Sequence, residues 1–264
     1  MTATAPEDRL TFVGHSTVLV ELGGVRLLTD PVLRDRLLHL RRHATAPARE
    51  VAERIDAVLI SHLHGDHLDL PSLRSVGGDV PLIVPRGAGA WLGRAGFERV
   101  VELAAGESTE VGELEVAAVR AHHQPRRWTL AGPKAQPIGF EVRGRTRGEA
   151  VDRHIYFAGD TDLFPGMDAL AGTIDIALLP VWGWGTSLGT GHLDPRRAAE
   201  AAARIRPRIA VPIHWGTFLP IGRARKHGHL LRDPPREFAA QVAELAPDVE
   251  VGVLEPGESL SVTA

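Results

Sequence analysis

The segment Ser61-His62-Leu63-His64-Gly65-Asp66-His67 places three imidazoles and one carboxylate within six positions. It follows the apolar residues 55–60, which indicate a buried strand, so its polar groups are expected in the loop at the carboxyl end of that strand. Sheets of α/β proteins commonly present functional groups at this edge. Because histidine and aspartate together suit zinc, iron or manganese, the segment predicts a transition-metal site.

The composition narrows the class of protein. A chain of 264 residues with 44% hydrophobic and 24% charged residues is typical of a globular protein. Its net charge of −3 argues against nucleic acid as a partner. Cysteine is absent, so disulfides and thiolate ligands are excluded and every metal ligand must be nitrogen or oxygen. With no signal-like amino terminus and no apolar run long enough to span a bilayer, we expect a cytoplasmic location.

Strand and helix signals alternate along the chain, which predicts one α/β domain over residues 1–264 with a flexible tail over residues 1–9. Strands are expected over residues 11–22, 25–29, 55–60, 81–84, 110–121, 138–142, 154–158, 174–180 and 209–213, with a closing strand pair over 249–262. Helices are expected over residues 88–95, 195–205 and 236–245, the second with Asp194 as N-cap and proline at its first position. Residues 34–49 indicate a surface loop or short helix.

Four further segments follow the same pattern, in which an apolar strand ends at a potential ligand. They are His122-His123, Gly159-Asp160-Thr161, Gly191-His192 and Pro212-Ile213-His214. Adjacent strand residues point to opposite faces, so His122 and His123 cannot both enter one site. Two neighbouring divalent ions need about seven or eight protein ligands, and a carboxylate is suited to bridge them. Asp160 is the candidate bridge.

The order His-x-His-x-Asp-His, His, Asp, His over residues 14–214 resembles that of the metallo-β-lactamase superfamily. The resemblance implies a four-layer αββα sandwich with two divalent metal ions at the sheet edges, zinc foremost, although manganese and iron accept the same donors. Carried over to this chain, it assigns His62, His64 and His123 to the first ion, Asp66, His67 and His214 to the second, and Asp160 to both. Members often read Val-Pro-Ala-x-His where this chain has residues 119–123 with arginine in place of proline, which favours His123.

Shorter motifs resemble one branch of the superfamily, that of the L-ascorbate-6-phosphate lactonases and N-acyl-phosphatidylethanolamine phospholipase D. They are Gly14-His15-Ser16-Thr17, Gly159-Asp160-Thr161, Gly191-His192-Leu193-Asp194-Pro195 and His214-Trp215-Gly216. The run His123-Gln124-Pro125-Arg126-Arg127 resembles the phospholipase's histidine and paired arginines, although the phospholipase's extended amino terminus has no counterpart. This branch implies a small phosphorylated, ester or lactone substrate. A homo-oligomer is compatible with the sequence.

Two such ions lower the pKa of a shared water and direct it at carbon or phosphorus, so the resemblance predicts a dinuclear hydrolase. Asp66 would bind metal or accept the proton of that water. His192 would act as an acid or oxyanion donor, unless it only makes local hydrogen bonds near a helix start. His15 is expected to support a ligand. The alternative function is a non-catalytic module that binds metal or senses a ligand.

Other residues carry open alternatives. Arg126, Arg127, Trp182 and Trp184 either line the substrate mouth or are merely solvated and packed. Asp30 and Asp162 either support the ligands or stabilise the fold. Residues 34–49, 182–191 and 218–229 are expected to shape the pocket.

Overall fold

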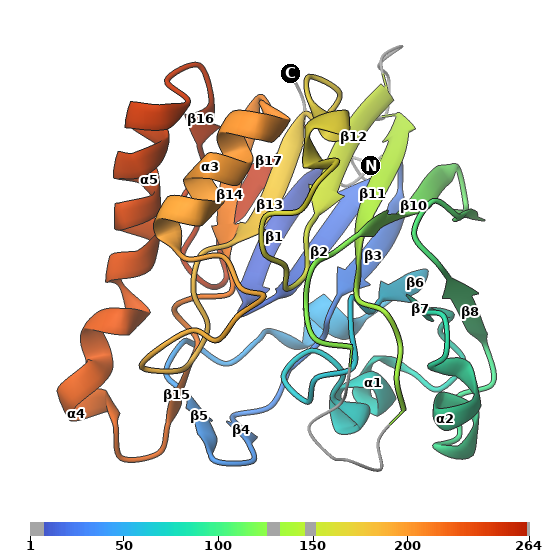
Figure 1. Ribbon diagram of the computed structural model, residues 1–264. Coiled ribbons are helices and arrows are strands. Elements are labelled where there is room, and N and C mark those ends of the chain that lie inside the picture. The colour runs from blue at the N-terminus through green and yellow to red at the C-terminus, as the bar shows by residue number, and fades with distance from the viewer. Residues whose placement is uncertain (1–7, 126–132, 146–151, 263–264) are drawn as a thin grey trace, which may run out of the picture.

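The computed structural model describes residues 8–125, 133–145 and 152–262, and two seven-stranded sheets form its centre (Figure 1). The first sheet has the order β17 (Ser259–Ser261), β1 (Arg9–Gly14), β2 (Thr17–Leu22), β3 (Val25–Thr29), β6 (Ala57–Leu59), β7 (Leu82–Pro85) and β8 (Val100–Leu103). The second has the order β16 (Glu250–Val251), β14 (Ile209–Ile213), β13 (Ile176–Pro180), β12 (Asp152–Phe157), β11 (Ile138–Arg145), β10 (Leu114–Arg120) and β9 (Ser108–Val111).

The main hydrophobic core lies between the two sheets and takes side chains from both, among them Phe12 and Val20 of the first and Val116 and Phe140 of the second. In β10, buried and partly buried positions alternate, as expected for a strand with one face on the core. The strands β13 and β14 are buried along their whole length, because they pair in parallel and are covered on both faces.

Helices complete the four layers. The helices α3 (Pro195–Ile205) and α5 (Asp233–Leu245) pack on the second sheet, whereas α1 (Leu70–Val76) and α2 (Gly89–Arg94) pack on the first (Figure 1). The αββα sandwich is therefore confirmed. The N-cap of α3 is as predicted, since the Asp194 carboxylate accepts a hydrogen bond from the Arg197 N–H at 2.8 Å.

The strand predicted over residues 11–22 is wrong in one respect that matters for the site. A tight turn divides it into β1 and β2, with Gly14 at φ 127° and His15 at φ 57°. The strand predicted over 110–121 is likewise divided into β9 and β10, at Gly112 with φ 57°. Apolar residues flank both turns, and Gly14 and Gly112 are the sequence features that mark where each strand is interrupted.

Three further expectations need correction. Residues 34–49 contribute β4 (Arg36–Leu37) and β5 (Leu40–Arg42), which form a small third sheet with β15 (Phe218–Pro220), a partner distant in sequence. The closing strands β16 and β17 do not pair with each other but join different large sheets. Residues 8 and 9, which the prediction placed in a flexible tail over residues 1–9, belong to the fold, because Arg9 begins β1 and the Asp8 carboxylate accepts a hydrogen bond from the Gly23 N–H at 2.9 Å.

The remaining helical turns are short: α4 (Ala224–His227), η1 (Arg49–Ala52), η2 (Met167–Leu170) and η3 (Gly228–Leu231). Among the described residues, none of the helices has the length and apolar character that crossing a membrane requires.

Candidate metal centre

The predicted ligands converge at one edge of the sandwich, because each follows the end of a strand. The histidine-rich segment follows β6, His123 follows β10, Asp160 follows β12 and His214 follows β14. The loops approach closely where they meet. Gly159 has φ 60°, and a Cβ there would lie 2.5 Å from the Ser61 Cβ, so only glycine fits beside the segment that begins at Ser61.

One group of potential ligands consists of His62, His64 and His123, whose nitrogen atoms lie within 4.8 Å of one another. The His123 Nε2 and the His64 Nδ1 are 3.1 Å apart. The structure therefore brings together the three histidines that the resemblance assigned to the first ion.

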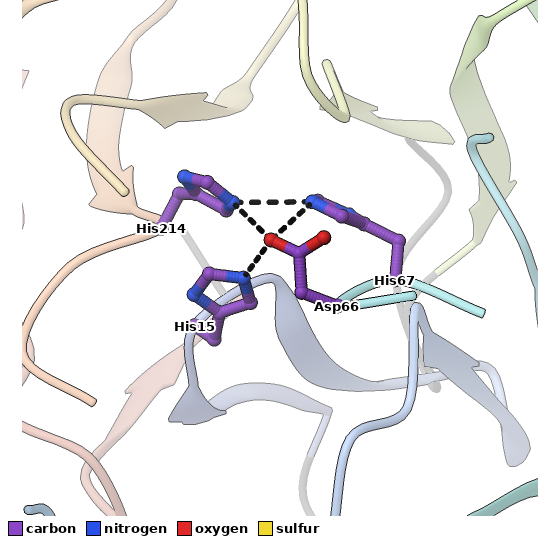
Figure 2. A group of neighbouring side chains, drawn as sticks. All are labelled: His15, Asp66, His67 and His214. Atoms are coloured by element: carbon purple, nitrogen blue, oxygen red, sulfur yellow. Dashed lines mark hydrogen bonds and ion pairs between the residues drawn. The ribbon is translucent and has the colours of Figure 1, made fainter. Parts of the chain in front are cut away.

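A second group consists of His15, Asp66, His67 and His214, all buried (Figure 2). The Nε2 atoms of His67 and His214 are 3.1 Å apart, and the His15 Nε2 lies 3.2 Å from the Asp66 carboxylate. Figure 2 shows the three imidazoles arranged around that carboxylate. Asp66, His67 and His214 thus lie together as predicted, and the His15 imidazole is within hydrogen-bonding distance of the Asp66 carboxylate.

The Asp160 carboxylate lies between the two groups. Its Oδ2 is 3.3 Å from the His67 Nε2 and 3.9 Å from the His62 Nε2, and its Oδ1 is 3.3 Å from the His214 Nε2. It approaches the inward-facing Nε2 atoms of imidazoles from both groups, which is the position required of a bridge.

Anchoring contacts orient the imidazoles. The Nδ1 atoms of four histidines contact oxygen atoms on the side away from the cluster, so that each Nε2 faces inward. These contacts are His62 with Ser61 Oγ at 3.0 Å, His67 with Asp30 at 2.7 Å, His123 with the Gly191 carbonyl at 2.7 Å and His214 with the Trp182 carbonyl at 2.5 Å. Asp30 also accepts hydrogen bonds from the Ser61 N–H and Oγ, so it supports the ligands.

Burial sets the charge of most of these histidines. It lowers the pKa of His64 to about 4 and that of His214 to about 3, and it holds the pKa of His62 well below the ordinary value. These imidazoles are neutral at pH 7, which is the form that binds metal. His67 differs. Burial opposes its charge, but the nearby carboxylates of Asp160 and Asp66 outweigh that effect and raise its pKa well above the ordinary value.

The donor set fits two small divalent ions. Nitrogen or oxygen ligands at about 2.0–2.1 Å from a tetrahedral zinc ion are separated by about 3.3 Å. The separations of 3.1 Å between His64 and His123, 3.1 Å between His67 and His214, and 3.3 Å between His67 and Asp160 match this value. In addition, the His62 Nε2 and the Asp160 Oδ1 are buried without hydrogen-bond partners among the described residues. Such atoms are costly unless a ligand occupies them.

Strained backbone accompanies the site. His15, Asp30 and His214 have φ values of 57°, 33° and 63°, which residues other than glycine rarely adopt. The turns that contain His15 and His214 are joined by a hydrogen bond, in which the His214 N–H donates to the His15 carbonyl at 2.7 Å. Strain of this kind collects where function overrides local preference.

A cavity of about 210 Å³ opens onto the cluster. His64, Asp66, Asp160, His192 and His214 form its floor and walls, and Gly183, Trp184, Gly185, Ser187, Leu188 and Gly189 line the rest. Of the three segments predicted to shape the pocket, only 182–191 lines it; β4, β5 and β15 instead lie behind Trp184, where the His39 ring packs edge-on against the indole at 5.1 Å.

His192 lies in this cavity, with its Nε2 3.5 Å from the Asp160 Oδ2 and its Nδ1 3.2 Å from the Gly189 carbonyl. Burial opposes its charge, but the hydrogen bond and negative charge of Asp160 raise its pKa above 6.5. It therefore makes a local contact and also faces the cluster.

The remaining sequence candidates separate clearly. His122 is exposed while His123 is buried, which agrees with the choice of His123. Asp162 accepts hydrogen bonds from Arg197 of α3 and has a structural role. The Trp182 indole donates to the Gly185 carbonyl and shapes the loop. Arg126 and Arg127 lie outside the described residues.

The sequence did not predict the contact of Trp184 with Asp66, and it predicted only a general supporting role for His15. The Trp184 Nε1 donates to the Asp66 Oδ2 at 2.8 Å, and His15 contacts the same oxygen. The glycine-rich context of Trp184 is the only sequence signal, because glycines on both sides allow a loop to fold over a site.

An α/β sandwich with a histidine and aspartate cluster at its sheet edge defines a metal-binding protein of the hydrolase type. The model of the family described as "Beta-lactamase superfamily domain" matches residues 25–215. The chain belongs to the metallo-β-lactamase superfamily.

Individual relatives agree with this assignment. The UPF0173 metal-dependent hydrolase of Methanopyrus kandleri is 34% identical over 266 residues, which cover 95% of this chain and 98% of that protein. N-acyl-phosphatidylethanolamine-hydrolyzing phospholipase D 1 of Caenorhabditis elegans is 30% identical over 236 residues, covering 80% of this chain and 64% of the phospholipase. This chain thus spans less than two thirds of that relative.

A solved structure shares the whole fold. Igni18, a metallo hydrolase from the hyperthermophilic archaeon Ignicoccus hospitalis, has a TM-score of 0.72 and 26% identity over 98% of this chain and 100% of its own.

Proposed function

We propose that this protein is a dinuclear metal-dependent hydrolase that acts on a small phosphodiester, ester or lactone. The single observation that carries the proposal is the position of Asp160 between two groups of imidazoles, at 3.3 Å from His67 and 3.9 Å from His62. His62, His64 and His123 would hold one ion, Asp66, His67 and His214 the other, and Asp160 both.

The two ions would supply an activated water at neutral pH and neutralise charge on the substrate. The protein's own groups do the rest. His15 and Trp184 fix the Asp66 carboxylate, and Asp30 fixes His67. Burial keeps most of the imidazoles neutral and ready to bind.

His192 is suited to donate a proton or a hydrogen bond to the substrate. It is partly exposed in the cavity and does not belong to either group of assigned ligands. In the metal-free protein the hydrogen bond and charge of Asp160 raise its pKa, which favours the protonated imidazole. A protonated imidazole there can stabilise negative charge that develops during hydrolysis.

Hydrolysis of an activated phosphodiester and of a simple lactone, measured side by side with metal-loaded protein, tests the function. Turnover of either substrate that disappears in His64→Ala is expected. Preference for the diester would indicate a phosphodiesterase and preference for the lactone a lactonase. Equal inactivity of wild type and variant, with both ions bound, would contradict the proposal and favour a non-catalytic binding module.

We expect metal binding to release about one proton at pH 7. The raised pKa of His67 keeps this imidazole protonated in the metal-free protein, and an ion that binds its Nε2 must displace the proton. Affinity should therefore increase as pH rises toward that pKa. Calorimetric zinc titrations in buffers of different ionisation enthalpy measure the proton count, and a heat independent of buffer would contradict the prediction.

Trp184→Phe is expected to lower the affinity for one of the two ions by about 10–100-fold, because it removes the N–H that orients Asp66 but keeps an aromatic ring. Stepwise metal titration, followed by metal analysis, measures the two affinities separately. Trp182→Phe is the matched control, since that indole donates to a backbone carbonyl instead. Equal affinities in the two variants would exclude a role for the Trp184 hydrogen bond.

A further inference from the structure

The third sheet and α4 form a basic region, which we define as residues 34–43 and 218–232 and call the cationic lobe (Figure 1). These two segments hold eight arginines and lysines but only one acidic residue, in a chain whose net charge is −3. Segments distant in sequence thus bring positive charge together at one end of an otherwise acidic protein.

Most of this charge faces solvent. Arg36, Arg41, Arg223, Arg225 and Lys226 are exposed, and none of the five has an ion-pair partner within residues 8–125, 133–145 and 152–262. Of the other three basic residues, Arg232 is also exposed, whereas Arg34 pairs with Asp69 and Arg42 is buried over the Phe218 ring. The exposed cations are therefore available to an external anion.

Two large aliphatic side chains project from the same lobe. Leu38 is 70% exposed and Ile221 is 54% exposed, the highest values among the large hydrophobic side chains of the described residues. Leu38 lies in the turn before β5 and Ile221 directly follows β15, the strand that pairs with β5, and the Ile221 N–H donates to the His39 carbonyl at 2.9 Å. Isolated exposed aliphatics are ordinary, but two on neighbouring segments that also carry these exposed cations are less so.

Backbone geometry supports a role for Leu38 outside the fold. It lies in the tight turn between β4 and β5 with φ 53°, a conformation that glycine or asparagine adopts far more readily. Leucine at this position is unfavourable both for the backbone and for solvation. With 70% of it exposed, packing within the fold does not explain that choice, whereas burial against an external apolar layer would.

The lobe is also close to the metal cavity. The His39 ring, next to Leu38, packs against Trp184, which lines the cavity. The lobe is thus one residue contact away from the wall of the cavity.

We propose that the cationic lobe docks on the surface of an anionic membrane, with Leu38 and Ile221 entering the interface and the arginines and Lys226 facing lipid headgroups. Interfacial binding of this type combines a small apolar insertion with attraction to anionic lipids. A second copy of this chain would bring like charges together, and nucleic acid offers no apolar layer for the two aliphatic side chains.

Sedimentation of the full-length protein with vesicles tests the proposal. Binding is expected to phosphatidylcholine vesicles that contain phosphatidylglycerol and not to phosphatidylcholine alone, and it should weaken with salt. The double variant Leu38→Asn with Ile221→Ser should lower the partition coefficient about tenfold or more, because it removes the apolar side chains that enter the interface. The double variant Arg223→Glu with Lys226→Glu should also lower it about tenfold or more, because each lysine or arginine contributes roughly a fivefold effect.

Matched controls separate docking from folding. Asparagine tolerates the backbone conformation of residue 38, so the double variant Leu38→Asn with Ile221→Ser is expected to unfold at the same temperature as the wild type. Val101→Ser and Arg94→Glu with Arg120→Glu change exposed residues on other elements and should leave vesicle binding unchanged. Hydrolysis of a soluble substrate should be unaffected by either lobe variant.

Three results would overturn the proposal: absence of binding to anionic vesicles, binding that the lobe variants retain, or equal binding to neutral vesicles. A dimer that dissociates in the Leu38 and Ile221 variant would assign the surface to a second copy instead. None of these results depends on whether the metal centre is hydrolytic.

Discussion

Replacing Asp160 by asparagine is expected to lower turnover by about 10³-fold and to reduce the bound metal from two ions to one or none. The amide has one oxygen in place of two and no negative charge, so it cannot hold both ions as the carboxylate would from its position 3.3 Å from His67 and 3.9 Å from His62. Loss of several kcal/mol of charge stabilisation corresponds to a rate effect of about this size. Metal analysis after dialysis and steady-state kinetics measure the two effects.

Asp162→Asn is the matched control, because this neighbouring carboxylate contacts Arg197 and lies outside both ligand groups. It should retain both ions and nearly full turnover, with any cost limited to stability. Retention of two ions and wild-type rates in Asp160→Asn would show that the central carboxylate is not a bridge.

His192→Ala is expected to retain both ions and lose about 10²–10³-fold in kcat, the usual cost of removing a group that stabilises developing charge. Because the imidazole would act in its protonated form, the wild-type rate should decline as pH rises through the pKa of His192 in the metal-loaded enzyme, and the variant should lack that decline. Metal content, kcat and the pH profile are measured together.

His122→Ala provides the comparison, since this exposed histidine precedes His123 but does not face the cavity. Loss of an ion in His192→Ala would reassign the imidazole as a ligand. An unchanged kcat would remove it from the mechanism.

The sequence predicts most of the potential ligands because each one follows an apolar strand. Strand ends are readable from hydrophobic runs, and parallel strands place their carboxyl ends at the same edge of a sheet. His62, His123, Asp160 and His214 belong to this class, and the structure brings all four together.

Contacts made by turns and loops are less predictable. His15 was expected only to support a ligand, and its direct contact with Asp66 depends on a turn that interrupts the strand pattern. The Trp184 hydrogen bond depends on how a glycine-rich loop folds back over the site. Neither follows from periodicity, because both depend on backbone dihedral angles and not on the order of apolar residues.

The third sheet illustrates the same limit on a larger scale. Residues 34–43 show no clean pattern, and β4 and β5 are strands because β15 pairs with β5 across about two thirds of the chain. Short strands gain their stability from such partners and not from local propensity.

By itself the sequence determined which donor atoms are available, where strands end and that no thiolate takes part, because these depend on residue type and local pattern. Only the tertiary structure decided that Asp160 lies between two imidazole groups, that Trp184 and His15 share Asp66, and that cations from two distant segments meet around Leu38 and Ile221. The physical reason is that separations of about 3 Å between groups far apart in sequence result from the packing of the two sheets, and no local pattern encodes them.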